Sequence, residues 1–483
     1  MKKTLNLKVL GAIIGMLLFT ASGLWAQDQM YITTFSDDAR DQFIKGRDKL
    51  ETMQYEKSID YFKKAVKEDP DFALAHLYYA LAKTGGANFS RDHLDKAINL
   101  VDKVTTGERH LILYAKASAN NNGLAMNKHI TTLNTMYPRD ERIQTWVGQY
   151  YYVNQDYKKA RKHLNLAYRL NNVFHPAVNL LGYTYMNMDN PNKAEKKFKE
   201  YISLIPANAN PYDSYAEFLL RQGRFNESIR NYEKALDYNQ DFVASHKGLG
   251  DNYLFTGDYN KAREHYQKYY DKAISDNQKF YALALQASVD IHQNNRVKAM
   301  NKLDEYIQLA EELDKPYYKV YGTAYKGYVL TETGKPSEGL KHYREAMNMI
   351  DEVDMPVQNR ENLKTTAYIW NYYALAANDD LKDAEDMRNK CKQRISEEQN
   401  KNQWKMYNSI SGIMEIKKGN YEKAKAHFEE SFDNPTTWYY TGLVWEKQGN
   451  ERKAQKYYEK VANHYNNTIE LAPIRNKAMA EIK

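Results

Sequence analysis

The feature that most constrains this sequence is a recurrence of small or flat residues at a fixed period. Seven of them are spaced 34 residues apart: Gly46, Ala80, Tyr114, Gly148, Gly182, Ala216 and Gly250. The series continues at looser spacing through Ala287, Gly327, Tyr372, Gly412 and Gly442, which gives twelve candidate units. A repeat of this length is typical of stacked supersecondary units, each packed on its neighbours. The sequence therefore predicts an elongated repeat array rather than one central core.

The best-preserved units share a longer pattern of apolar, small and aromatic positions. It is seen in Val178-x2-Leu181-Gly182-x2-Tyr185 followed by Ala194-x3-Phe198 and Pro206, in His246-x2-Leu249-Gly250-x2-Tyr253 followed by Ala262-x3-Tyr266, and in Trp438-x2-Thr441-Gly442-x2-Trp445 followed by Ala454-x3-Tyr458. This pattern resembles the tetratricopeptide repeat family over roughly residues 36–468. The resemblance implies an all-α fold, a right-handed α-solenoid of about twelve helical hairpins with a C-terminal capping helix.

Repeat regularity divides the sequence into segments. Residues 36–272 are expected to form a regular array, and residues 273–468 degenerate repeats with longer helices or loops, because the spacing after Gly250 becomes 37, 40, 45, 40 and 30 residues. Residues 469–483 are expected to form a capping helix over the last hairpin.

The N-terminal residues have the three-part order of a secretory signal peptide. A basic stretch, residues 1–8, precedes an apolar run at residues 9–19, and small residues follow before Leu24-Trp25-Ala26. Cleavage is expected after Ala26, with Gly23 as the second choice, which defines a signal peptide at residues 1–26. The apolar run is shorter than the roughly 20 residues of a spanning helix. We therefore expect a periplasmic or other extracytoplasmic protein without stable membrane insertion; an uncleaved membrane anchor is the alternative.

Charge and cysteine content exclude other classes of protein. The net charge is +7, but Lys and Glu are mixed along the chain, unlike the basic stripe of a nucleic-acid-binding protein. Cys391 is the only cysteine, so neither an intramolecular disulfide nor a cysteine-rich metal site is possible within the chain. Its apolar helical position predicts a buried packing thiol, with a reactive thiol as the alternative.

Family resemblance also implies where a partner would bind. In tetratricopeptide arrays the first helices line a concave groove, and residues near each small position should point into it. The candidate groove residues are Arg142, Gln149, Tyr152, Asn179, Tyr183, Asp213, Glu217, Lys247 and Asp251. A polar groove with both signs of charge and tyrosines suits a peptide, although any solvated helix face has similar residues. Family members that bind chaperones clamp a C-terminal carboxylate with Lys and Asn; the matching positions here, Asn179 with Tyr183 and Lys247 with Asp251, do not fit that clamp.

The sequence contains no motif for catalysis or a cofactor. Neither His-Glu-x-x-His nor Cys-x-x-Cys occurs, and no metal or cofactor is expected. His76, His110 and His246 stand at the same place in their repeats, which predicts a packing role. The leading interpretation is an extracytoplasmic scaffold or adaptor for other proteins or peptides. The alternative is a sensor or carrier of a peptide, glycan or other ligand, and an enzyme ranks last.

Overall fold

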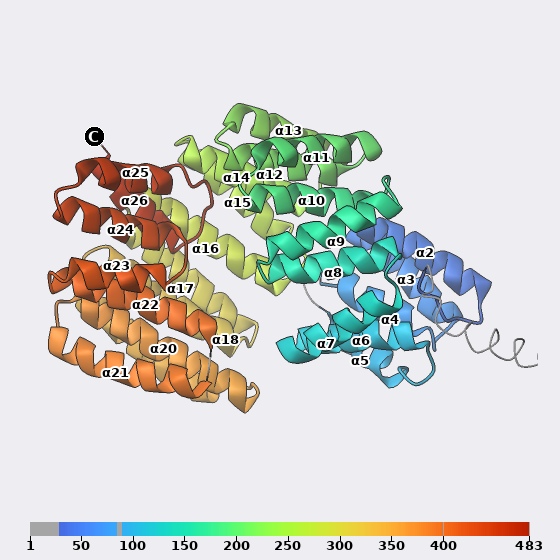
Figure 1. Ribbon diagram of the computed structural model, residues 1–483, viewed down its shortest axis with the longest axis horizontal. Coiled ribbons are helices and arrows are strands. Elements are labelled where there is room, and N and C mark those ends of the chain that lie inside the picture. Colours follow the sequence, from blue (N-terminus) through green and yellow to red (C-terminus); the bar gives the residue numbers. More distant parts are fainter. Residues whose placement is uncertain (1–28, 85–88, 399, 483) are drawn as a thin grey trace, which may run out of the picture. The chain divides into compact units, whose positions relative to one another are not determined.

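The computed structural model describes residues 29–84, 89–398 and 400–482. The predicted signal peptide, residues 1–26, lies outside the described residues. Within them the regular secondary structure is helical, with no strand (Figure 1). Twelve consecutive helical hairpins are followed by one further helix, so the predicted fold class is confirmed.

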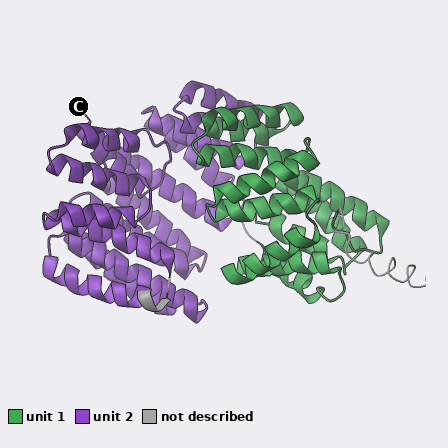
Figure 2. Ribbon diagram, viewed as in Figure 1, with its two compact units in different colours: residues 1–218 green, residues 219–483 purple. Residues whose placement is uncertain are grey.

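Two compact units divide the chain, residues Met1–Phe218 and Leu219–Lys483, termed unit 1 and unit 2 (Figure 2). The helices up to the boundary are α2 (Asp37–Glu51), α3 (Tyr55–Glu68), α4 (Ala73–Ala82), α5 (Arg91–Asn99), α6 (Thr106–Ala119), α7 (Gly123–Met136), α8 (Glu141–Val153), α9 (Tyr157–Leu170), α10 (His175–Asn187), α11 (Pro191–Leu204) and α12 (Ala209–Arg221). The boundary lies inside α12, so it does not coincide with the loosening of the repeat near residue 272.

Unit 2 continues with helices that are longest in the middle of the unit. They are α13 (Phe225–Tyr238), α14 (Val243–Phe255), α15 (Tyr259–Asp271), α16 (Asp276–His292), α17 (Arg296–Glu312), α18 (Pro316–Glu332), α19 (Pro336–Met349), η2 (Ile350–Glu352), α20 (Val357–Ala377), α21 (Leu381–Glu398), α22 (Lys401–Lys417), α23 (Tyr421–Glu429), α24 (Pro435–Lys447), α25 (Glu451–Ala462) and α26 (Leu471–Glu481). The first hairpins use helices of 13 or 14 residues, whereas α16, α17 and α18 have 17 and α20 has 21. Most of the extra spacing between repeats is therefore helical.

The recurring small residue is explained by one contact inside the hairpin. A Cβ atom added to Gly182 would lie 2.7 Å from Cε1 of Phe198, the aromatic residue 16 positions later in the second helix. Likewise, a Cβ atom added to Gly250 would lie 2.4 Å from Cε1 of Tyr266. Both aromatic rings are fully buried. The small residue thus makes room for the ring that fills the hairpin, which is why the two positions recur together.

Helix ends within the hairpins follow local chemistry. Gly257 ends α14 with a φ of 84°, the left-handed conformation that glycine adopts without steric cost. The side chain of Asp258 then accepts a hydrogen bond from the backbone N–H of Lys261 and caps α15. Between α16 and α17, Asn294 adopts the left-handed conformation and the side chain of Asn295 caps α17. These short polar turns set the length of each hairpin.

The residues before α2 run along the first hairpins of unit 1. The backbone N–H of Met30 donates to Asp140 Oδ2 at 2.8 Å, and that of Thr33 donates to Glu108 Oε1 at 2.7 Å. Asp140 caps α8, and Glu108 belongs to a capping box at the start of α6. This segment therefore links the starts of successive first helices. Among the described helices, none is long and apolar enough to cross a membrane.

Candidate binding surfaces

Arg142, the first predicted groove residue, is engaged within unit 1. Its Nε atom donates to Glu51 Oε1 at 3.0 Å, which joins the first hairpin to the fourth. Its guanidinium also lies 4.9 Å from the ring centroid of Phe174, a cation–π contact. The Arg142 side chain therefore contributes to the packing of the array as well as to its charge.

Three further predicted groove residues lie on α8 and α10 at the surface or close to it. Gln149 is exposed, and the Tyr152 hydroxyl accepts a hydrogen bond from Asn187 Nδ2 at 3.0 Å. The Asn179 side chain is half-buried, and its Oδ1 atom has no hydrogen-bond partner. Of these three, Gln149 is the most available to a second molecule.

Tyr183, Asp213 and Glu217 come together between α10 and α12. The Tyr183 hydroxyl donates to Glu217 Oε2 at 3.0 Å, and its ring packs edge-on against Phe198. Burial raises the pKa of Tyr183 well above its usual value, and the charges of Glu217 and Asp213 raise it further. The predicted face of unit 1 is thus a hydrogen-bonded acidic and phenolic surface rather than a row of independent side chains.

Lys247 and Asp251, the two predicted residues of unit 2, pair with each other. Lys247 Nζ lies 2.6 Å from Asp251 Oδ2, and the Tyr266 hydroxyl donates to Asp251 Oδ1 at 2.6 Å. Asp251 is only 1% exposed, so it is part of the interior. Tyr266, which donates to Asp251, also accepts a hydrogen bond from a segment near the C-terminal end of unit 2.

That segment is the C-terminal strap, defined as residues 463–482. Residues 464–468 have no regular secondary structure, and α26 follows after a turn. The Tyr465 ring packs edge-on against Phe225 and Phe255, with centroids 4.9 and 5.4 Å away. The Arg475 guanidinium lies over both Phe255 and Tyr465. The beginning of the strap is therefore fixed in an aromatic contact with the first hairpins of unit 2.

The middle of the strap is buried against α15, α16 and α18. Asn467, 1% exposed, donates from Nδ2 to the Tyr266 hydroxyl at 3.0 Å and to Ser288 Oγ at 2.7 Å. The Tyr328 hydroxyl donates to the backbone carbonyl oxygen of Glu470 at 2.7 Å. Ile469 completes an apolar cluster with residues of α16, α17 and α18.

The end of the strap, α26, contacts the last hairpin of unit 2 and also helices nearer its middle. It packs on α24 and α25, the last hairpin, and also on α16 and α18. Lys477 Nζ lies 2.5 Å from Glu332 Oε2, and Asn476 Nδ2 donates to the Ile291 carbonyl oxygen at 2.8 Å. The strap therefore lies across the unit, a property that sequence reasoning missed because its prediction placed this helix only on the last hairpin.

Removal of the Asn467 side chain tests how firmly the strap is held. Asn467→Ala is expected to lower the free energy of unfolding by about 1 kcal/mol, a modest loss because Tyr266 and Ser288 still donate to Asp251 and Leu285. Chemical denaturation followed by circular dichroism measures the change. Asn226→Ala on the exposed surface of α13 is the matched control. Equal stability of the two variants would show that the strap is only loosely attached.

The recurring histidines pair across their hairpins. Nδ1 of His76 lies 2.9 Å from Nδ1 of His93, and His110 stands in the same relation to His129. Burial lowers the pKa of each of these four rings, so they are neutral at pH 7. These contacts agree with the predicted packing role. Each histidine has a second histidine 17 or 19 residues later in the sequence, and this spacing was a usable signal of the pairing.

An aromatic surface follows one side of α18 in unit 2. Tyr317, Tyr321, Tyr325 and Tyr328 are spaced four, four and three residues apart, which places them on one helix face. The ring centroids of Tyr317 and Tyr321 are 4.9 Å apart, and Tyr321 lies 5.6 Å from Trp370 of α20. We name these five residues the α18 aromatic face. Sequence reasoning did not select them, although their helical spacing was a usable signal.

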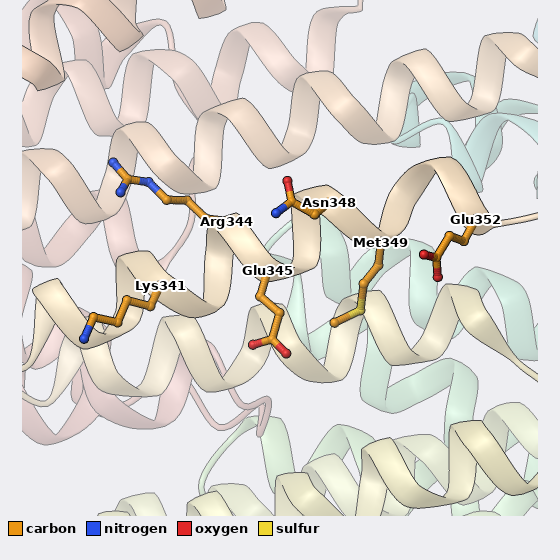
Figure 3. A pocket seen from close by; sticks show the side chains of 6 residues that line it. All are labelled: Lys341, Arg344, Glu345, Asn348, Met349 and Glu352. Carbon is orange, nitrogen blue, oxygen red and sulfur yellow. The ribbon is translucent and has the colours of Figure 1, made fainter.

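One further surface feature offers few groups for binding or chemistry. A shallow depression follows α19 and η2, lined by Lys341, Arg344, Glu345, Asn348, Met349 and Glu352 (Figure 3).

Cys391 is fully buried, and burial raises the pKa of its thiol to about 12, so the thiolate that reactivity requires is not formed near neutral pH. Within the described part of the chain, no three His, Cys, Asp or Glu side chains are grouped so as to hold a metal ion.

Comparison with known proteins supports the repeat assignment. Models of the tetratricopeptide repeat match residues 175–208, 208–275 and 436–468. The mitochondrial import receptor subunit TOM70 of Rattus norvegicus is 24% identical over 323 residues, which cover 62% of this chain and 50% of that protein. The Homo sapiens protein is also 24% identical, over 325 residues with the same coverage. This chain thus spans about half the length of these relatives.

Parts of this chain are also similar to solved structures. MamA is 19% identical over 36% of this chain and 94% of its own, with a TM-score of 0.29. A tetratricopeptide repeat protein from Parabacteroides merdae is 15% identical over 63% of this chain and 98% of its own, with a TM-score of 0.31. PilW, a type IV pilus biogenesis factor, is 14% identical over 45% and 97%, with a TM-score of 0.37. The matches to the family models place tetratricopeptide repeats in both units of this chain, within an all-helical array of hairpins.

Proposed function

We propose that this protein is an extracytoplasmic scaffold or adaptor that binds segments of other proteins. The observation that carries the proposal is the strap, because unit 2 holds a non-helical polypeptide segment against its own helices through ring contacts and buried hydrogen bonds. The same kinds of contact serve peptide recognition between molecules. The tetratricopeptide repeats support the proposal, since such repeats generally bind other proteins.

Site-specific photo-crosslinking in native cells tests the proposal. A photoreactive residue at exposed Gln149 on α8 is expected to capture a defined protein from the envelope fraction. The control places the same residue at exposed Lys162 on α9, the second helix of that hairpin. Capture at Gln149 and not at Lys162 supports binding through the first helices. Absence of a reproducible partner at either position would count against the scaffold function.

Export is tested separately from binding. Protein isolated from cells is expected to begin at Gln27, because the predicted cleavage follows Ala26. N-terminal sequencing after osmotic release of the periplasm measures this. A chain that still begins at Met1 and sediments with membranes would favour the anchored alternative.

A carrier of small ligands is the second candidate function. The α18 aromatic face favours it, because tyrosine and tryptophan rings bind sugars and organic cations. A thermal-shift screen with envelope oligosaccharides and short peptides tests this candidate, since a ligand that binds the folded state raises the melting temperature. A shift with an oligosaccharide and none with peptides would favour the carrier over the scaffold.

A further inference from the structure

Glu470 is an exposed carboxylate held at a fixed place in unit 2. It stands between buried Ile469 and the first turn of α26, and its backbone carbonyl oxygen accepts a hydrogen bond from the Tyr328 hydroxyl at 2.7 Å. The position of its backbone is therefore set by the α18 aromatic face itself. Its side chain reaches solvent but has protein around it, which raises its pKa by removing part of its water.

The Glu470 carboxylate is also electrically uncompensated. Among the described residues it forms no ion pair, whereas Glu332, the other acid near Tyr328, is paired with Lys477. Burial is the main cause of the raised pKa of Tyr321, Tyr325 and Tyr328, and the charge of Glu470 raises each further, so the carboxylate lies within electrostatic range of most of the α18 aromatic face. A negative charge beside electron-rich rings makes this surface attractive to a cation.

The rings are accessible enough to contact a ligand. Tyr317 is 44% exposed, and Tyr321, Tyr325, Tyr328 and Trp370 are half-buried. A guanidinium or ammonium group over the face of a tyrosine or tryptophan ring is attracted by the electron-rich ring. Within unit 2, Lys453 already lies over Trp445 and Lys460 over Trp438, with nitrogen-to-centroid distances of 3.8 and 3.7 Å. In the α18 aromatic face no lysine or arginine of the described chain takes this place.

We propose that Glu470 and the α18 aromatic face form a binding site for a basic side chain, arginine or lysine, of a partner polypeptide. The carboxylate supplies the opposite charge, and Tyr321 with Trp370 supplies the rings over which the cation lies. A carbohydrate could use the rings and donate hydroxyl hydrogen bonds to the carboxylate, but only a cation would also neutralise its unpaired charge, so the charge favours a cation. This inference rests on the proposed binding of proteins and names the chemistry of the segment that is bound.

A pair of labelled peptides tests the site on the full chain. The probe is fluorescein-Ser-Gly-Ser-Gly-Arg-Gly-Ser-Gly-Ser, and the matched peptide has Gln in place of Arg. Fluorescence anisotropy is expected to show at least tenfold tighter binding of the Arg peptide. Glu470→Gln is expected to weaken the Arg peptide about tenfold while leaving the weak Gln peptide unchanged. Glu459→Gln on the exposed surface of α25 is the matched control and should retain full affinity.

Ring substitutions separate recognition from folding. Tyr321→Phe keeps the aromatic ring and should retain binding of the Arg peptide, whereas Tyr321→Leu should lose it, each at an unchanged melting temperature. If Tyr321→Leu does not fold, Glu470→Gln decides the result, because that change preserves size and the acceptor for Thr468. Equal binding of the two peptides, or undiminished binding by Glu470→Gln, would overturn the inference. An oligosaccharide that binds where the Arg peptide does not would reassign the surface to carbohydrate.

The photo-crosslinked partner distinguishes this inference from the proposed function. If wild-type protein and Glu470→Gln capture the same partner in equal amounts, the basic-side-chain site is wrong and the scaffold function stands. If neither captures a partner, the scaffold function fails.

Discussion

Lowering the pH from 7 to 5 is expected to lower the free energy of unfolding of unit 2 by about 2–4 kcal/mol. Burial lowers the pKa of His292 and of His464 to about 4, and Arg475 lies close to both, while Arg221 and Lys460 also face His464. An unfolded histidine has a pKa near 6.5, so at pH 5 only the unfolded state takes up these protons. Stability is therefore full above pH 6.5 and is lost as the pH falls towards 4.

Tryptophan emission during urea denaturation measures this effect, because four of the six tryptophans belong to unit 2: Trp370, Trp404, Trp438 and Trp445. The raised pKa of Glu470 acts in the opposite direction and offsets part of the loss. Replacing both His292 and His464 by Asn should make the dependence on pH shallower without abolishing it, because burial also lowers the pKa of His246 in unit 2 to about 4. His342→Asn, at the surface of α19, should leave it as steep as in the wild type. A free energy that is constant between pH 7 and 5 would show that these rings are not held neutral.

Gly182→Leu is expected to lower the free energy of unfolding of unit 1 by about 1–3 kcal/mol or more, because the added side chain would overlap Phe198. The first atom of that side chain would already stand 2.7 Å from the ring, and the ring, fully buried between helices, has no free space to move into. The hairpin must therefore open or the helices must shift.

Gly123→Leu is the control, since nothing lies within 4 Å of a Cβ atom at Gly123. Thermal unfolding followed by circular dichroism compares the two variants. The repeat register is correct only if the loss is confined to Gly182→Leu; two similar melting curves would mean that the close helix contact lies elsewhere.

Much of the fold could be predicted because its determinants are local. Gly182 and Phe198 are 16 residues apart, and the same pair recurs as Gly250 with Tyr266, so a periodic pattern reveals each hairpin without knowledge of the rest. The binding surfaces were harder to predict. Arg142 and Asp251 were chosen by helical position. Yet Arg142 is paired with Glu51 of a distant hairpin, and Asp251 is buried and bonded to Tyr266 of its own hairpin, because side chains on other helices decide what a helix face exposes.

The strap could not have been predicted by the same reasoning. Tyr465, Asn467 and Ile469 are ordinary residues for a loop, and no repeat pattern marks them. Asn467 bonds to Ser288 and Tyr266, which lie 179 and 201 residues earlier in the chain. Single-sequence periodicity contains information about neighbours along a helix or between adjacent hairpins, and none about a contact at this separation. The α18 aromatic face could be predicted in part, since the helical spacing of its tyrosines can be seen in the sequence. The contact of Tyr328 with Glu470 could not be predicted in this way.

A stack of hairpins ordinarily folds and melts piece by piece, because each repeat depends only on its neighbours. The strap changes this, since the hydrogen bond between Asn467 and Tyr266 makes one of the first hairpins of unit 2 depend on a residue that is synthesised 201 positions later. At a synthesis rate of about 5–20 residues per second, roughly 10–40 s separate the two. During that interval Tyr266 and Ser288 have no strap to contact, so their hydrogen bonds to Asn467 cannot yet form. Once the strap is in place, the hairpins between Tyr266 and Asn467 should unfold as a single cooperative unit.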